Sequence, residues 1–309
     1  KPISGATGRR CARTLDLFVT AFARASAGKL RPGFTVTLPK IARPAEVTAF
    51  VELLDMLEDA TDLRRGVVGL ELMIESPRAL VDDTGRIALG ALVEAAGGRC
   101  VAVHLGAYDL TAAMGVAATD QRLDHPLCDH ARVLMQLALA GSGVAVVDGA
   151  TTTLPIPPHA PRPDAPLGDT ERAANARAVL DAWSLHARNV RRALDVGIHE
   201  GWDLHPAQLP ARYGAIFASY LAQRAAMGER LRDFVARATR ATRTGQVFDD
   251  AATGQGLVNF FLRGLACGAL DEADLRATGL TEDELRSRSF ARIAAARADA
   301  LPVSSRGAP

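Results

Sequence analysis

The chain has 309 residues, of which 48% are hydrophobic and 23% charged, and its formal net charge is +1. This composition is ordinary for a globular protein, and the length suits one barrel-sized domain with a helical extension. A net charge so close to zero gives no reason to expect binding to nucleic acid or to an anionic membrane. No apolar run approaches the roughly 20 residues that span a bilayer, so we expect no membrane association.

The four cysteines lie far apart in the sequence and form no CxxC pair; they are Cys11, Cys100, Cys128 and Cys267. This spacing argues against a zinc site. Scattered thiols also suit a reducing compartment better than a disulfide-stapled fold. We therefore expect the protein to be cytoplasmic.

Short apolar runs alternate with helical patterns through the first two hundred residues. In chain order the patterns predict strand 34–40, helix 45–60, strand 67–75, helix 87–96, strand 99–106, helix 129–140, strand 143–148, helix 172–197 and strand 201–205. Six prolines make segment 151–170 a loop. Because the strands are separated by helices and read as nearly continuous apolar runs, we expect a parallel sheet.

After Leu209 every pattern is helical, and a capping box of Thr281 and Glu284 is expected to begin the last helix. These patterns predict an α/β domain over 1–210 and a helical region over 211–309. The apolar segment 256–270 would expose a large patch on a monomer, which favours a homo-oligomer.

Polar residues stand at the ends of the predicted strands. In parallel α/β folds the C-terminal ends of the strands face one site. That rule selects five residues, which would share a pocket: Lys40, Glu75, Asp109, Asp148 and His205.

Glu75 and Asp109 stand at successive strand ends. Two carboxylates about 4 Å apart repel by roughly 4 kcal/mol at an effective dielectric near 20. Either one of them holds a proton, which gives a general acid/base pair, or a cation such as Mg²⁺ lies between them. A third interpretation is structural: Glu75 caps the following turn and Asp109 is a helix N-cap.

Lys40 also has three interpretations: a Schiff-base lysine, a charge that orients an anionic substrate, or a surface residue. The turn from Gly106 through Ala107 to Tyr108 could offer backbone N–H groups to a carboxylate. The imidazole of His205 either bonds a neighbouring carbonyl or faces the pocket. Among the other histidines, we expect His104 to be buried in its strand and the rest to lie on helix or loop surfaces, His186 among them.

Five segments together carry a family resemblance: TLPK (37–40), ELMIESPRAL (71–80), HLGAYDLTAAMG (104–115), HPLCDHARVLMQLALAGSGVAVVDG (125–149) and GWDLHPAQLP (201–210). In this order and spacing they resemble the citrate lyase β-subunit-like superfamily, which includes malyl- and citramalyl-CoA lyases and class II 2-oxo-acid aldolases. The resemblance covers roughly residues 34–210. It implies a TIM-type (β/α)8 barrel of the phosphoenolpyruvate/pyruvate-binding type, followed by a C-terminal helical extension.

The resemblance also implies a site and an activity. Glu75 and Asp109 would be the ligands of Mg²⁺ or Mn²⁺, Lys40 would lie near the substrate, and residues 106–108 would bind a carboxylate. The expected activity is a metal-dependent carbon–carbon lyase or aldolase, acting through a metal-stabilised enolate on a 2-oxo acid such as pyruvate or on an acyl-CoA thioester.

Two alternatives stay open: a thioester hydrolase or synthase of the same superfamily, and a non-catalytic metabolite-binding barrel subunit. Members of the superfamily are commonly trimers or hexamers. The family barrel has two strands upstream of those predicted here, so we expect these strands to lie outside the sequence, with Lys1 to Ile3 as the end of a further one.

Overall fold

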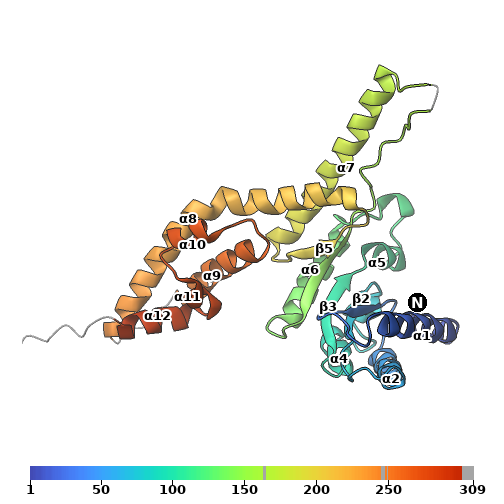
Figure 1. The fold of residues 1–309 in the computed structure, drawn as a ribbon, viewed down its shortest axis with the longest axis horizontal. Helices are drawn as coiled ribbons and strands as arrows, with labels where there is room; N and C mark the ends of the chain where they lie inside the picture. Colours follow the sequence, from blue (N-terminus) through green and yellow to red (C-terminus); the bar gives the residue numbers. More distant parts are fainter. Residues whose placement is uncertain (163–164, 245–247, 249, 301–309) are drawn as a thin grey trace, which may run out of the picture. The chain divides into compact units, whose positions relative to one another are not determined.

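The computed structural model describes residues 1–162, 165–244, 248 and 250–300. The chain divides into two compact units, Lys1–Arg212 and Tyr213–Pro309. Strands alternate with helices in the first unit, whereas the described part of the second is helical (Figure 1). Among the described helices, none combines the length and the apolar character that a membrane crossing requires.

The first unit contains a sheet of five parallel strands in sequential order. The strands are β1 (Thr35–Leu38), β2 (Gly69–Ile74), β3 (Cys100–Leu105), β4 (Ala145–Ala150) and β5 (Glu200–Trp202). The five predicted strands and their parallel pairing are therefore confirmed. The expected further strand at Lys1 to Ile3 is wrong, because these residues form no strand. In the described part of the chain β1 and β5 are the edges of an open sheet, so a closed barrel is not seen.

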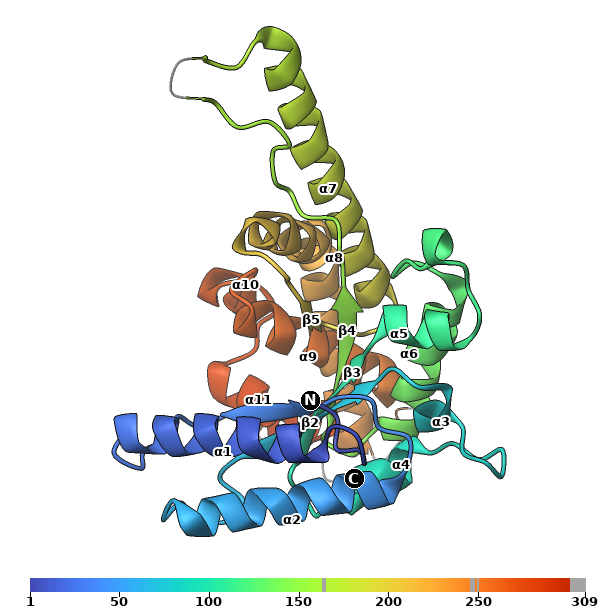
Figure 2. The ribbon, with the colours of Figure 1, turned by 90° about the vertical axis from the view of Figure 1, so that its right-hand side faces the viewer.

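The helices of this unit are α1 (Gly8–Ala25), α2 (Pro44–Ala60), α3 (Pro77–Leu80), α4 (Leu89–Ala95), α5 (Ala107–Ala113), α6 (Pro126–Leu139) and α7 (Asp169–Asp195). All four predicted helices are present. The sequence patterns missed α1, which lies beside α2 (Figure 2), and the short helices α3 and α5. The described residues between β4 and α7 form no helix or extended strand, as the prolines predicted.

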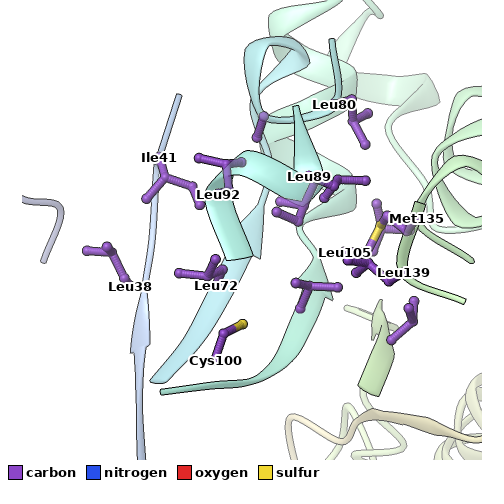
Figure 3. Close-up of a cluster of buried hydrophobic side chains, with 14 of the residues drawn as sticks. Leu38, Ile41, Leu72, Leu80, Leu89, Leu92, Cys100, Leu105, Met135 and Leu139 are labelled. Carbon is purple, nitrogen blue, oxygen red and sulfur yellow. The ribbon is translucent and has the colours of Figure 1, made fainter. Parts of the chain in front are cut away.

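One face of the sheet carries the hydrophobic core. Alternate residues of β2, Leu70, Leu72 and Ile74, point to this face, where α2, α4 and α6 cover them. Figure 3 shows leucines of strands and helices meeting there. Each fully buried leucine contributes about 1.5–3 kcal/mol relative to an exposed one, so this face holds much of the stability of the unit.

The opposite face of β2 is polar, because period-two alternation sends Glu71, Met73 and Glu75 to it. Neighbouring strands add Thr37 and His104 to the same side. The expectation of a nearly continuous buried apolar run is therefore wrong at Glu71. This polar face leads along the strands toward the C-terminal ends, where Glu75 stands.

The second unit contains most of α8 (Leu209–Thr244) and all of α9 (Ala251–Ala266), α10 (Glu272–Ala277), α11 (Glu282–Arg286) and α12 (Phe290–Ala300). Thr281 and Glu284 form the predicted capping box, but it begins α11, and α12 follows. The expected exposed patch on segment 256–270 is wrong. Leu257, Val258 and Phe261 are buried within this unit, so the segment gives no argument for an oligomer.

Candidate functional site

Glu75 and Asp109 are brought together by two adjacent strands. Glu75 directly follows β2, Asp109 lies in the first turn of α5 after β3, and Ile74 pairs with Leu105. Gly106 makes the approach possible, because a Cβ at this position would lie 2.3 Å from the Cβ of Glu75. Gly106 therefore serves to make room for the Glu75 side chain.

Lys40 completes the cluster from a third strand end. Its backbone N–H donates to Oε1 of Glu75 at 2.7 Å, and its Nζ lies 2.6 Å from Oδ2 of Asp109. Lys40 has φ +56°, and it is one of four non-glycine residues with positive φ in the described chain. Such a conformation costs on the order of 1–3 kcal/mol and is typical of functional sites. The left-handed turn directs both donors of one residue at the two carboxylates.

The three charges influence one another. Burial, followed by a hydrogen bond with Asp109, raises the pKa of Glu75 to about 7. Hydrogen bonds from Lys40 and then Glu75 lower the pKa of Asp109, and the hydrogen bond to Asp109 raises the pKa of Lys40. Near neutral pH the two carboxyls therefore hold a proton for part of the time, as neighbouring acids do.

The residues present suit a hard divalent cation. No group of three or more His, Cys, Asp or Glu side chains with ligand geometry occurs among the described residues, so a ligand set built wholly from side chains is not seen there. Mg²⁺ commonly uses one or two carboxylates and leaves its other positions to water and substrate oxygens. Burial is the main cause of the raised pKa of Glu75, and a divalent cation would stabilise the charged forms of both carboxylates.

A second polar network, missed by the sequence patterns, crosses the polar face of the sheet. Oγ1 of Thr37 donates to Oε2 of Glu71 at 2.7 Å, and Nε1 of Trp202 donates to Nδ1 of His104 at 2.6 Å. An indole N–H can only donate, so in the neutral imidazole the proton is on Nε2. That atom lies 3.2 Å from Oε2 of Glu71, outside hydrogen-bond geometry.

His104 is buried, as predicted, with 5% of its surface exposed. Burial lowers its pKa, against the influence of Glu71. The imidazole is therefore neutral near pH 7, and its orientation is fixed by Trp202. The signals of this network in the sequence were a glutamate, Glu71, within one apolar strand and a histidine, His104, within the next.

Two of the five expected strand-end residues are used differently. Both carboxylate oxygens of Asp148 accept hydrogen bonds from the buried Arg132, at 2.8 and 3.2 Å, so Asp148 fastens α6 to β4. Nδ1 of His205 accepts from the backbone N–H of Ala207, which makes His205 the cap of a short 3-10 turn. Asp148 therefore has both oxygens engaged by Arg132, whereas the backbone engages only Nδ1 of His205, and a contact of His205 with substrate stays a prediction.

The turn 106–108, expected to bind a carboxylate through its backbone N–H groups, differs in part from that expectation. The amide of Gly106 donates to the carbonyl of Ile74 at 2.9 Å and so belongs to the sheet. The side chain of Ala107 packs in the core, and the hydroxyl of Tyr108 donates to the carbonyl of Ala150 at 3.0 Å. Only the amides of Ala107 and Tyr108, in the first turn of α5, keep the position predicted for binding a carboxylate.

His186 was expected on a helix surface, and that expectation is wrong. Its two ring nitrogens lie 2.9 Å from Oγ1 of Thr151 and 2.7 Å from Oδ1 of Asp203, and Arg212 holds the other oxygen of Asp203. The arrangement resembles a hydroxyl–imidazole–carboxylate triad. Thr151 is only 2% exposed, however, so its hydroxyl is closed to a substrate. The cluster joins α7 to the segments that follow β4 and β5.

The fold and the site thus define a mixed α/β protein with a parallel sheet, a helical extension and a carboxylate pair at adjacent strand ends. A citrate lyase from Burkholderia xenovorans LB400 has a similar structure, with a TM-score of 0.52 and 20% identity over 85% of this chain and 72% of that chain. At this identity the likeness establishes the fold alone.

Two structures of malate synthase from Haloferax volcanii are more distant, each with a TM-score of 0.42, and they support no further argument. One is 17% identical over 58% of this chain and 44% of that chain, and the other is 14% identical over 86% and 68%. No curated protein sequence matches the chain. A family model matches residues 1–293, and the chain therefore belongs to this family, which is described as a domain of unknown function, DUF6986.

Proposed function

We propose that the protein is a divalent-metal-dependent carbon–carbon lyase that acts on a 2-oxo acid or an acyl-CoA thioester. The observation that carries this proposal is the meeting of Lys40, Glu75 and Asp109 at three strand ends, with the pKa of Glu75 raised to about 7. The fold shared with a protein described as a citrate lyase motivates the choice of lyase chemistry. The (β/α)8 barrel and a homo-oligomer, trimeric or hexameric, belong to the same proposal.

In this proposal Glu75 and Asp109 hold Mg²⁺ or Mn²⁺. The bound cation would supply positive charge where enolate charge develops during cleavage, an interaction that strengthens in the transition state. Glu75 must give up its carboxyl proton for the cation to bind; its pKa of about 7 opposes this loss, but the carboxyl is still ionised in part at neutral pH. Asp109 keeps its charge throughout, because its pKa is lowered.

Lys40 has the role of binding the anionic group of the substrate. Its side chain is 52% exposed, so a carboxylate can reach the ammonium group from solvent. Its raised pKa keeps it protonated, which disfavours a Schiff base because imine formation requires the neutral amine. The amides of Ala107 and Tyr108 provide two further donors at the start of α5.

The test is a screen of pyruvate, oxaloacetate, malyl-CoA and citramalyl-CoA with Mg²⁺ or Mn²⁺, following release of the keto product. We expect one of these classes to turn over, and both Glu75→Gln and Asp109→Asn to lose on the order of 100-fold in kcat/KM, since charge stabilisation by a metal is worth several kcal/mol. Asp195→Asn, at an exposed helical ion pair, is the matched control and should retain full activity.

Activity that does not depend on metal, or that survives Glu75→Gln, would contradict the proposed mechanism. Hydrolysis of the thioester without C–C cleavage would identify a hydrolase instead. Binding of metal and pyruvate without turnover of any substrate would favour a metabolite-binding subunit.

A further inference from the structure

Lys40 places a positive charge beside the carboxylates of Glu75 and Asp109. Among the described residues it is the only basic side chain paired with either Glu75 or Asp109. The chain contains only three lysines, and the other two, Lys1 and Lys29, both precede the first strand. In this structure the cluster therefore supplies its own cation.

The backbone conformation of Lys40 positions its ammonium group. The hydrogen bond from the amide of Lys40 to Oε1 of Glu75 fixes the loop on the first carboxylate. From this anchor, the left-handed conformation at φ +56° lets the ammonium reach Oδ2 of Asp109. The amide contact does not depend on the side chain, so the ammonium can leave Asp109 while the loop keeps its place.

A divalent cation held by both carboxylates would come within a few ångströms of the ammonium, which lies 2.6 Å from Oδ2 of Asp109. A +1 charge and a +2 charge within a few ångströms repel, and this repulsion is only partly screened in a half-buried site. The ammonium at Asp109 therefore disfavours the binding of a divalent cation there. The side chains of Lys40 and Asp109 are 52% and 54% exposed, so their ion pair is weak enough to be broken.

We propose that Lys40 is an internal competitor for the metal, which limits metal affinity in the free protein and is released when the metal binds. This inference rests on the proposed metal site of Glu75 and Asp109. Once released, the ammonium is available to an anionic substrate, and an anion that holds it away from Asp109 favours metal binding. Metal and anionic substrate therefore support each other's binding, with Lys40 as the link.

The experiment measures the affinity for Mn²⁺ alone, by electron paramagnetic resonance or titration calorimetry, in the full chain at pH 7.5. Lys40→Met and Lys40→Gln remove the charge and keep a side chain of similar length at the same backbone angle. We expect both variants to bind Mn²⁺ on the order of tenfold more tightly than the wild type, from removal of one unit charge a few ångströms away. Lys40→Arg keeps the charge and should bind as weakly as the wild type.

Lys29→Met is the matched control, because Lys29 is exposed and stands well outside the site in sequence. It should leave the affinity unchanged. Equal, measurable affinity in the wild type and both Lys40 variants overturns the inference and leaves the metal site standing. Weaker binding in both variants also overturns it, and would show that Lys40 organises the site. Absence of Mn²⁺ binding in every variant refutes the metal site and the inference together.

Discussion

Charged side chains gather at both ends of the strands of the sheet, and the two clusters are built differently. At the N-terminal end, Arg99 donates to both oxygens of Glu58, at 2.9 and 2.6 Å, and the amides of Gly66 and Val68 donate to the same carboxylate. Arg99 also pairs with Asp55. Glu58 is fully buried, and every oxygen it carries has a partner.

At the C-terminal end the cluster of Lys40, Glu75 and Asp109 is half exposed. Burial alone would raise the pKa of Glu58, but the hydrogen bonds from Arg99 and two amides lower it. The pKa of Glu75 is raised instead, because no comparable set of donors compensates for its burial. The charges at the N-terminal end therefore stabilise the fold, whereas those at the C-terminal end stay available for a ligand. This is the usual division between the two ends of parallel strands.

The largest effect should come from breaking the N-terminal cluster. Arg99→Met leaves the carboxylate of Glu58 buried without its charged partner, and we expect a loss of about 3–5 kcal/mol in the free energy of unfolding. Urea denaturation followed by circular dichroism measures it. Lys40→Met, at the exposed cluster, should cost less than about 1 kcal/mol in the same experiment. A loss below about 1 kcal/mol for Arg99→Met would show that the backbone donors alone satisfy Glu58.

We expect Gly106→Ala to lower the stability less than Arg99→Met does, but to weaken metal binding at the site. The new methyl group would meet the Cβ of Glu75 at 2.3 Å, so one of the two must move, at a cost of about 1–3 kcal/mol. The displacement should weaken Mn²⁺ binding, measured by calorimetry, and lower the melting temperature. Gly90→Ala is the matched control, since a Cβ there meets nothing within 4 Å, and in α4 it should be neutral or slightly stabilising. Unchanged Mn²⁺ affinity in Gly106→Ala would count against Glu75 as a ligand.

The smallest effect concerns pH. A carboxyl whose folded pKa is raised from 4.5 to about 7 stabilises the fold fully below pH 4.5, and this contribution is lost as the pH rises to 7. Solvent screening of the half-exposed group keeps the effect below about 2 kcal/mol. In metal-free buffer the melting temperature of the wild type should therefore fall more between pH 5 and 8 than that of Glu75→Gln. Identical pH profiles would show that Glu75 titrates normally.

The sequence predicted the elements of the sheet well and the use of its polar residues only in part. Leu70, Leu72 and Ile74 gave a strong strand signal, because burial selects apolar residues whatever the neighbouring strand contains. Asp148 and His205 stood at predicted strand ends like Glu75, yet one binds Arg132 and the other caps a turn. The partner of Asp148 comes from α6, a helix that the strand itself does not encode, whereas His205 bonds the turn that directly follows it.

By itself the sequence determined five parallel strands, the helices between them, a helical C-terminal region and the strand-end positions of Lys40, Glu75 and Asp109. These follow from local periodicity and from the geometry that all parallel sheets share. Only the tertiary structure decided that the apolar face of α9 is buried within its own unit, that His104 is fixed by Trp202, and that Lys40 pairs with Asp109. The physical reason is that each of these contacts joins segments distant along the chain, so its existence depends on how the strands and helices pack.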